Sequence, residues 1–188
     1  EIRLPEAIDR NLLAPFHSFG ITDTIDLEDV SWSKGGYDKR TLSEKYTGNR
    51  ERAVHVASSL ERYVTDINAI IGLGFCVSVD HAIFMSDMFN EIGIPSGYLT
   101  GESDQKTRNS IQSRLLKGEI HFIFVVDLYN EGVDIPEVNT VLFLRPTESM
   151  TVFLQQLGRG LRISEGKECL TVLDFVGRQH SNYRFDTK

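Results

Sequence analysis

The chain has 188 residues, of which 40% are hydrophobic and 25% charged, and this balance predicts one compact domain with an appendage. Its formal net charge of -7 argues against a freestanding nucleic-acid-binding protein, because backbone phosphates are held mainly by Lys and Arg. No apolar run approaches the roughly 20 residues that a membrane helix needs, and the N-terminus has neither a signal-peptide pattern nor an initiator Met, so we expect a soluble piece of a longer protein.

The first part of the chain predicts an irregular arm followed by a long helix. Residues 1 to about 48 mix aromatic residues with turn formers and acids, without sustained periodicity, and one short strand is expected at 15 to 21. Between residues 49 and about 71, apolar residues recur at the three- and four-residue steps of one helix face: Val54, Ala57, Leu60, Val64, Ile67 and Ile71. Gly72 and Gly74 are expected to end this helix.

After Gly74, short β-branched or aromatic runs alternate with helix-patterned segments, as in βαβ units. Strands are predicted at FCVSV (75–79), SGYLT (96–100), HFIFVV (121–126), TVLFL (140–144) and CLTVLDF (169–175). Helices are predicted at about 80 to 92, 104 to 118 and 149 to 162. The pattern therefore predicts an α/β doubly wound parallel sheet with helices on both faces, and we divide the chain into an arm over 1–48 and a lobe over 49–188.

The cysteines and histidines give no sign of a metal site. Cys76 and Cys169 each lie inside an apolar run, which favours buried free thiols in a reducing cytoplasm over a disulfide framework. The five histidines show neither an HExxH motif nor another paired metal spacing, so we interpret them as structural or surface groups.

The segment EGVDIP, which follows the predicted strand at 121–126, is a candidate ligand loop. Functional groups of doubly wound sheets gather beyond the carboxyl ends of the strands. Gly132 lets the backbone approach a ligand closely, and the Asp134 carboxylate can accept a hydrogen bond from a ribose hydroxyl or orient an arginine. A plain turn in which Asp134 caps a local backbone group accounts for the same residues.

The segment QQLGRGLR (155–162) is a candidate anion site. Gln155, Arg159 and Arg162 fall at i, i+4 and i+7, so one helix face would present an amide and two guanidinium groups. The two like charges repel, and Gly158 and Gly160 weaken the helix by up to ~1 kcal/mol each, which favours an anionic partner such as phosphate. The alternative is a solvated basic stripe at a helix C-terminus.

These two segments resemble motifs V (EGxDxP) and VI (QxxGRxxR) of the superfamily 2 helicases. GFCVSVDHA (74–82) resembles motif IV, and the LTGES turn (99–103) with Arg108 resembles the nucleic-acid-facing segment that follows it. Over about residues 70 to 176 the chain is therefore identified as similar to the C-terminal RecA-like lobe of a DEAD/DEAH-type helicase, most of all to bacterial restriction-motor-like helicases. Upstream, residues 14–29 resemble the connecting segment between the two lobes of that group.

The resemblance implies a role for individual residues. Arg162 would be the arginine finger that reaches the γ-phosphate of ATP, Arg159 its companion, and Gln155 the residue that couples nucleotide to the lobe interface. The other implied positions are those near the nucleotide, Gly132, Asp134 and Gly158, and those facing nucleic acid, Thr100, Gly101 and Arg108.

Two positions depart from the family pattern. Val126 stands where relatives often carry Thr or Ser, so the nucleic-acid contact of that hydroxyl is not expected here. Glu131 stands where many RNA helicases carry Arg, which favours DNA over RNA as the partner.

No GxxxxGK[ST] phosphate-binding loop is present. The nearest segment, GLRISEGKE (160–168), has one residue too many between its glycines and ends in Glu where a magnesium-binding hydroxyl is needed. We therefore expect ATP and Mg²⁺ to be held mainly by an N-terminal RecA-like lobe of the same protein, and this chain alone to hydrolyse no ATP. The alternatives are a catalytically inert RecA-like scaffold and an unrelated nucleotide-binding α/β domain.

Overall fold

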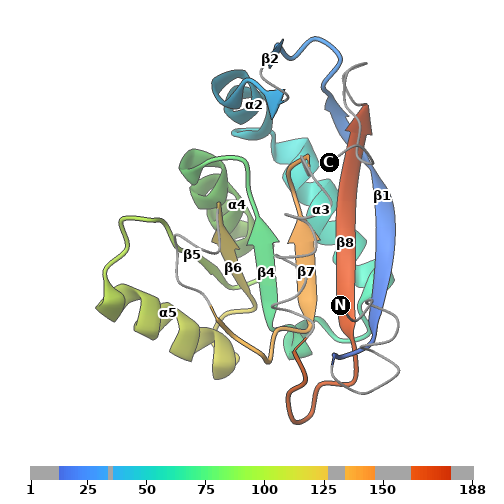
Figure 1. The fold of residues 1–188 in the computed structure, drawn as a ribbon. Coiled ribbons are helices and arrows are strands. Elements are labelled where there is room, and N and C mark those ends of the chain that lie inside the picture. The colour runs from blue at the N-terminus through green and yellow to red at the C-terminus, as the bar shows by residue number, and fades with distance from the viewer. Residues whose placement is uncertain (1–12, 34–35, 127–133, 147–161, 179–188) are drawn as a thin grey trace, which may run out of the picture.

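A six-stranded parallel sheet forms the centre of the molecule (Figure 1). The computed structural model describes residues 13–33, 36–126, 134–146 and 162–178. The sheet consists of β1 (Phe16–Asp26), β4 (Gly72–Phe75), β5 (Ser96–Tyr98), β6 (Phe122–Val125), β7 (Thr140–Phe143) and β8 (Leu170–Arg178). Its strand order is β1-β8-β7-β4-β6-β5, and every neighbouring pair is parallel. The predicted doubly wound α/β sheet is confirmed.

The helices α3 and α4 cover one face of the sheet, and α5 packs against the other face near its edge (Figure 1). The described helices are α2 (Lys39–Tyr46), α3 (Arg50–Tyr63), α4 (Val79–Ile92) and α5 (Gln105–Leu116), with a 3-10 turn, η1 (Ile67–Ala69). Each α-helix begins where a side-chain oxygen accepts a first-turn N–H, at Asp38, Asn49, Ser78 and Asp104. Among the helices that the structure describes, none has the length and apolar character needed to cross a membrane.

The core lies on both sides of the sheet because successive strand side chains point to opposite faces. Phe122 and Phe124 of β6 face α3 and α4, where they pack against Phe89. Ile123 and Val125 face the opposite side with Phe75 and Phe143. The central strands are buried on both faces, as expected for a parallel sheet, so their side chains fix the positions of the loops at either end.

Gly72 and Gly74 lie inside β4 and do not end a helix, contrary to the prediction. A Cβ atom at Gly72 would lie 2.3 Å from the Phe122 ring, and one at Gly74 would lie 2.4 Å from the Phe124 ring. These glycines therefore make room for the aromatic side chains of β6. The helix α3 ends at Tyr63, where the Val64 N–H still donates to the Leu60 carbonyl at 2.8 Å. Ala57 and Leu60 are buried as predicted, whereas Val54 is 48% exposed.

The N-terminal segment is more regular than predicted. The strand expected at 15 to 21 is present as β1, which runs to Asp26 and pairs with β8 at the edge of the sheet. The helix α2 and a small antiparallel pair, β2 (Trp32–Ser33) and β3 (Gly36–Tyr37), follow it. Leu27, Val30 and Tyr46 are buried in the cluster that joins these elements. The division into an arm and a lobe at residue 48 stays a prediction.

Candidate functional site

Asp134 and Arg162 form an ion pair at the surface. Arg162 Nη1 donates to Asp134 Oδ1 at 3.0 Å and to Oδ2 at 2.9 Å. The Arg162 side chain is 52% exposed and that of Asp134 is 46% exposed, so solvent screens the pair and its contribution to stability is at most about 1 kcal/mol. The contact orients the guanidinium group of Arg162, and the exposure of that side chain leaves it accessible to an anion.

This pair lies near the amino-terminal ends of the strands, whereas the ligand loops of such a sheet are expected beyond the carboxyl ends. After Asp134, the buried side chains of Ile135 and Val138 enter the core. The Asn139 N–H then donates at 3.0 Å to the carbonyl of Ile71, the residue just before β4. The chain leaves β6 at the carboxyl ends of the strands. From Asp134, where the structure describes it again, it lies near their amino-terminal ends.

Lys167 links the backbone segment that contains Asp134 to the segment that contains Arg162. Its Nζ atom donates to the Pro136 carbonyl at 3.0 Å and to the Arg162 carbonyl at 3.0 Å. Burial lowers the pKa of the Lys167 ammonium to about 8, although the nearby Glu137 carboxylate acts in the opposite direction. Sequence reasoning missed this residue, because its Gly-Lys pair was considered only as an imperfect phosphate-binding loop.

Thr100, Gly101 and Arg108 come together after the carboxyl end of β5. The turn closes on itself, since the Thr100 N–H donates to Ser103 Oγ at 3.0 Å and the Ser103 N–H to the Thr100 carbonyl at 3.1 Å. Arg108 donates from Nε to the Ser103 carbonyl at 2.7 Å, and from Nη2 to the carbonyls of Thr100 and Gly101 at 3.2 Å each. Arg108 therefore organises the turn by donating hydrogen bonds to the backbone carbonyl oxygens of the turn.

A groove of about 520 Å³ opens beside this turn, between α4 and α5. Thr100 and Ser103 line it, and Tyr98 and Arg114 contribute an aromatic ring and a charge. The Tyr98 residue is 40% exposed. The predicted nucleic-acid-facing residues thus lie at a surface with polar, charged and aromatic groups.

Four predicted site residues lie outside the described residues: Gly132, Gln155, Gly158 and Arg159. Of the predicted nucleotide-facing set, the structure therefore places Asp134 and Arg162, and it places them in contact.

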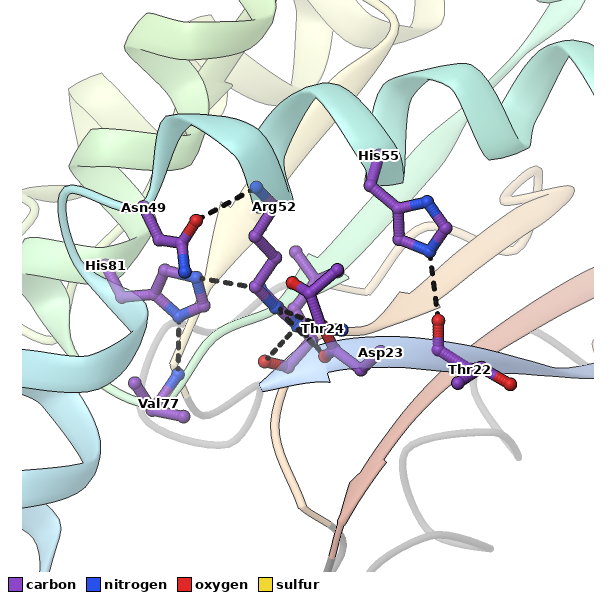
Figure 2. Close-up of polar contacts among 9 residues, drawn as sticks. Thr22, Asp23, Thr24, Asn49, Arg52, His55, Val77 and His81 are labelled. Atoms are coloured by element: carbon purple, nitrogen blue, oxygen red, sulfur yellow. Dashed lines mark hydrogen bonds and ion pairs between the residues drawn. The ribbon is translucent and has the colours of Figure 1, made fainter. Parts of the chain in front are cut away.

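A buried charged cluster, which the sequence did not predict, joins β1 to α3 (Figure 2). Arg52 donates from Nε to Asp23 Oδ1 at 2.9 Å and from Nη2 to Oδ2 at 2.7 Å. The two side chains are 1% and 0% exposed. Arg52 Nη2 also donates to the Leu144 carbonyl at 3.2 Å, and its guanidinium carbon lies 4.4 Å from the centre of the Tyr46 ring.

Neighbouring polar groups complete this cluster. His81 Nδ1 accepts from the Val77 N–H at 3.2 Å, and burial together with the Arg52 charge holds the pKa of His81 well below its usual value (Figure 2). A neutral, fully buried His81 at the start of α4 is a structural group, one of the two kinds expected of the histidines. The cluster thus holds β1, α3, α4 and the end of β7 together.

Comparison with known proteins gives matches over most of the chain. Residues 59–164 match the family described as "Helicase conserved C-terminal domain". The chain is 31% identical over 172 residues to the putative ATP-dependent helicase IRC3 of Saccharomyces cerevisiae, covering 92% of this chain and 25% of the yeast protein. It thus spans about a quarter of that relative's length.

Two solved structures have a similar fold. The Escherichia coli DEAD-box protein SrmB, bound to regulator of ribonuclease activity A, matches with a TM-score of 0.57 and 24% identity over 70% of this chain and 74% of that chain. The ATP-dependent type ISP restriction-modification enzyme LlaBIII, bound to DNA, matches with a TM-score of 0.53 and 19% identity over 92% of this chain and 12% of that chain. These likenesses confirm the predicted RecA-like fold.

Proposed function

The chain belongs to the family of helicase conserved C-terminal domains, and from this premise we propose that it is the second motor lobe of an ATP-dependent nucleic-acid helicase or translocase of superfamily 2. In this proposal Arg162, with Arg159 as its companion on the same phosphate, acts on ATP that is bound to a first RecA-like lobe of the same protein. The observation that carries the proposal is the contact between Arg162 and Asp134 at the surface.

The Arg162 side chain fits a phosphate group of a nucleotide. ATP supplies a γ-phosphoryl group whose oxygens gain negative charge during transfer. The described contact with Asp134 uses only Nη1, so Nε and Nη2 can donate to an anion while Asp134 keeps the side chain oriented. Fixed positive charge aimed at such oxygens accelerates hydrolysis by about 10³- to 10⁵-fold in comparable enzymes.

Mg²⁺ is proposed to bind mainly to the first lobe. Within the part of the chain that the structure describes, no three His, Cys, Asp or Glu side chains are grouped so that they could hold a metal ion. Asp134 itself is engaged by Arg162. We therefore assign Asp134, with Gly132 and Gly158, to the surroundings of the nucleotide and not to the metal.

The turn with Thr100, Gly101 and Arg108 is proposed as the nucleic-acid contact. Its position at the carboxyl edge of the sheet, opposite to the Asp134–Arg162 pair, would let one lobe touch both nucleotide and nucleic acid. We propose DNA as the partner over RNA because of Glu131, and a reducing cytoplasm as the compartment because both cysteines are free thiols. A competition assay with DNA and RNA of one sequence tests the first of these choices.

Substitution of Arg162 by Ala in the full-length protein tests the main proposal. ATP binding should survive, while hydrolysis should fall by about 10³- to 10⁵-fold. Arg40→Ala is a matched control, because the Arg40 side chain is 88% exposed and lies on α2, outside both proposed sites. Equal loss of binding and hydrolysis would make Arg162 a structural support, and a wild-type protein without any ATPase activity would favour an inert scaffold.

A further inference from the structure

Lys167 occupies an unusual position for a lysine. Its ammonium group is partly buried and donates to two main-chain carbonyls, those of Pro136 and Arg162, at 3.0 Å each. One carbonyl belongs to Arg162 itself, and the other lies two residues beyond Asp134. The segments that carry Asp134 and Arg162 are therefore joined both by the side-chain ion pair and by Lys167, which donates to one backbone carbonyl of each segment.

A tight turn places Lys167 there. The Lys167 N–H donates to the Ser164 carbonyl at 3.2 Å, and Gly166 adopts a φ of +80° within the turn. This backbone conformation suits glycine, because other residues are strained at positive φ. The turn folds the chain back so that the Lys167 side chain reaches the carbonyl of Arg162, five residues earlier.

We propose that Lys167 is a positioning residue, which fixes the backbone of Arg162 relative to the loop of Asp134 and so sets where the Arg162 guanidinium group presents itself to ATP. This inference rests on the function proposed above. A surface ion pair alone is too weak to fix two segments in place, because side-chain entropy and solvent offset most of its attraction. Two charge-assisted hydrogen bonds from one partly buried ammonium supply the missing constraint.

A positioning role for Lys167 differs in its kinetic effects from a role in stabilising the fold. Loss of Lys167 leaves the Arg162 and Asp134 side chains present, so affinity for ATP should change little. The rate should nevertheless fall, because a displacement of about 1 Å at a catalytic group can lower a rate by about 100-fold. Arg162 must be present for this effect, since Lys167 is proposed to act only through it.

The test uses Lys167→Met in the full-length protein, with and without Arg162→Ala, in a steady-state ATP hydrolysis assay sensitive enough for slow variants. We expect K167M to lower kcat by about 10- to 100-fold, with KM for ATP within about threefold of wild type. In the R162A background, K167M should cause no further loss. Lys117→Met is the matched control, because Lys117 is exposed at the end of α5.

A second variant tests the same proposal independently, in case K167M does not fold. Gly166→Ala keeps the Lys167 side chain but strains the turn that directs it, and it should lower kcat in the same manner, without effect in the R162A background. Thermal unfolding of each variant shows whether the lobe stays folded. Equal losses from K167M with and without Arg162, a change in KM alone, or an unchanged kcat would overturn this inference. An R162A variant with normal hydrolysis would instead overturn the proposed function, and the inference with it.

Discussion

Arg162 and Asp134, which are 28 residues apart in the sequence, share two contacts of 3.0 and 2.9 Å between Nη1 and the carboxylate oxygens. Each residue belongs to a different segment that the sequence singled out, and Asp134 was expected either to accept from a ribose or to orient an arginine. The structure shows the contact with an arginine. Their action on ATP stays a prediction.

We predict that the chain by itself hydrolyses no ATP, because its sequence carries no GxxxxGK[ST] loop. The 188-residue chain should give the buffer rate in a phosphate-release assay, with the full-length protein as the positive control. Turnover by the chain alone that survives repurification would contradict the division of labour between two lobes.

Arg108 should act on nucleic-acid binding mainly through the shape of the turn, because its Nε and Nη2 donate to three backbone carbonyls. Arg108→Lys keeps the charge but loses the forked geometry, so it should weaken DNA binding nearly as much as Arg108→Met. The slope of log Kd against log salt should stay close to wild type in both variants. If Arg108 instead contacts a DNA phosphate directly, R108K should retain most of the affinity. R108M should then reduce the slope of log Kd against log salt by about 0.7 to 0.9.

Arg52→Met should destabilise the lobe by about 3 to 5 kcal/mol in urea unfolding, because it leaves the Asp23 carboxylate buried without its partner. Adding Asp23→Asn should recover part of this loss, since it removes the unpaired charge. Arg40→Ala, at an exposed ion pair, should cost less than about 1 kcal/mol. A double variant no more stable than R52M would show that packing of the Arg52 side chain, and not its charge, carries the effect.

Asp174 should make stability depend on pH. Burial raises the pKa of this carboxyl group from 3.8 to about 6. The folded state therefore binds the proton more tightly than the unfolded state, so the contribution of Asp174 to stability is fully present below about pH 3.8 and is lost as pH rises from there through about 6. Asp174→Asn should raise the free energy of unfolding at pH 7.5 by about 1 to 3 kcal/mol and change it little at pH 4. The exposed Asp87→Asn variant is the control, and an equal gain from D174N at both pH values would exclude titration of Asp174 as the cause.

Much of the fold could be predicted because local patterns determine it. Runs such as HFIFVV and TVLFL are apolar on both faces, as central parallel strands require, and the structure places β6 and β7 within them. Glycines were misinterpreted where packing decides their role. Gly72 and Gly74 resemble helix breakers in sequence, yet they lie in β4 because the rings of Phe122 and Phe124, about 50 residues away, leave no room for a side chain.

The buried Asp23–Arg52 pair and the role of Lys167 were not predicted, because both depend on contacts between residues that are distant in the sequence. Asp23 and Arg52 lie in segments with surface-like composition, 29 residues apart, and only the packing of α3 on β1 buries them together. One local signal existed for Arg52, because it lies four residues before Val56 and next to Ala53 on the buried face of α3. For Lys167 no periodicity was available, since a turn and not a helix directs its side chain.

The central claim is that Arg162 stabilises charge that develops on the transferring phosphoryl group of ATP, and binding of a transition-state analogue tests it most directly. In the full-length protein, affinity for ADP with aluminium fluoride should exceed affinity for ADP alone, because the enzyme is complementary to the transition state. Arg162→Ala should abolish this preference while leaving the Kd for ADP within about threefold of wild type. A variant that keeps the full preference, or that loses affinity for both ligands equally, would contradict the claim.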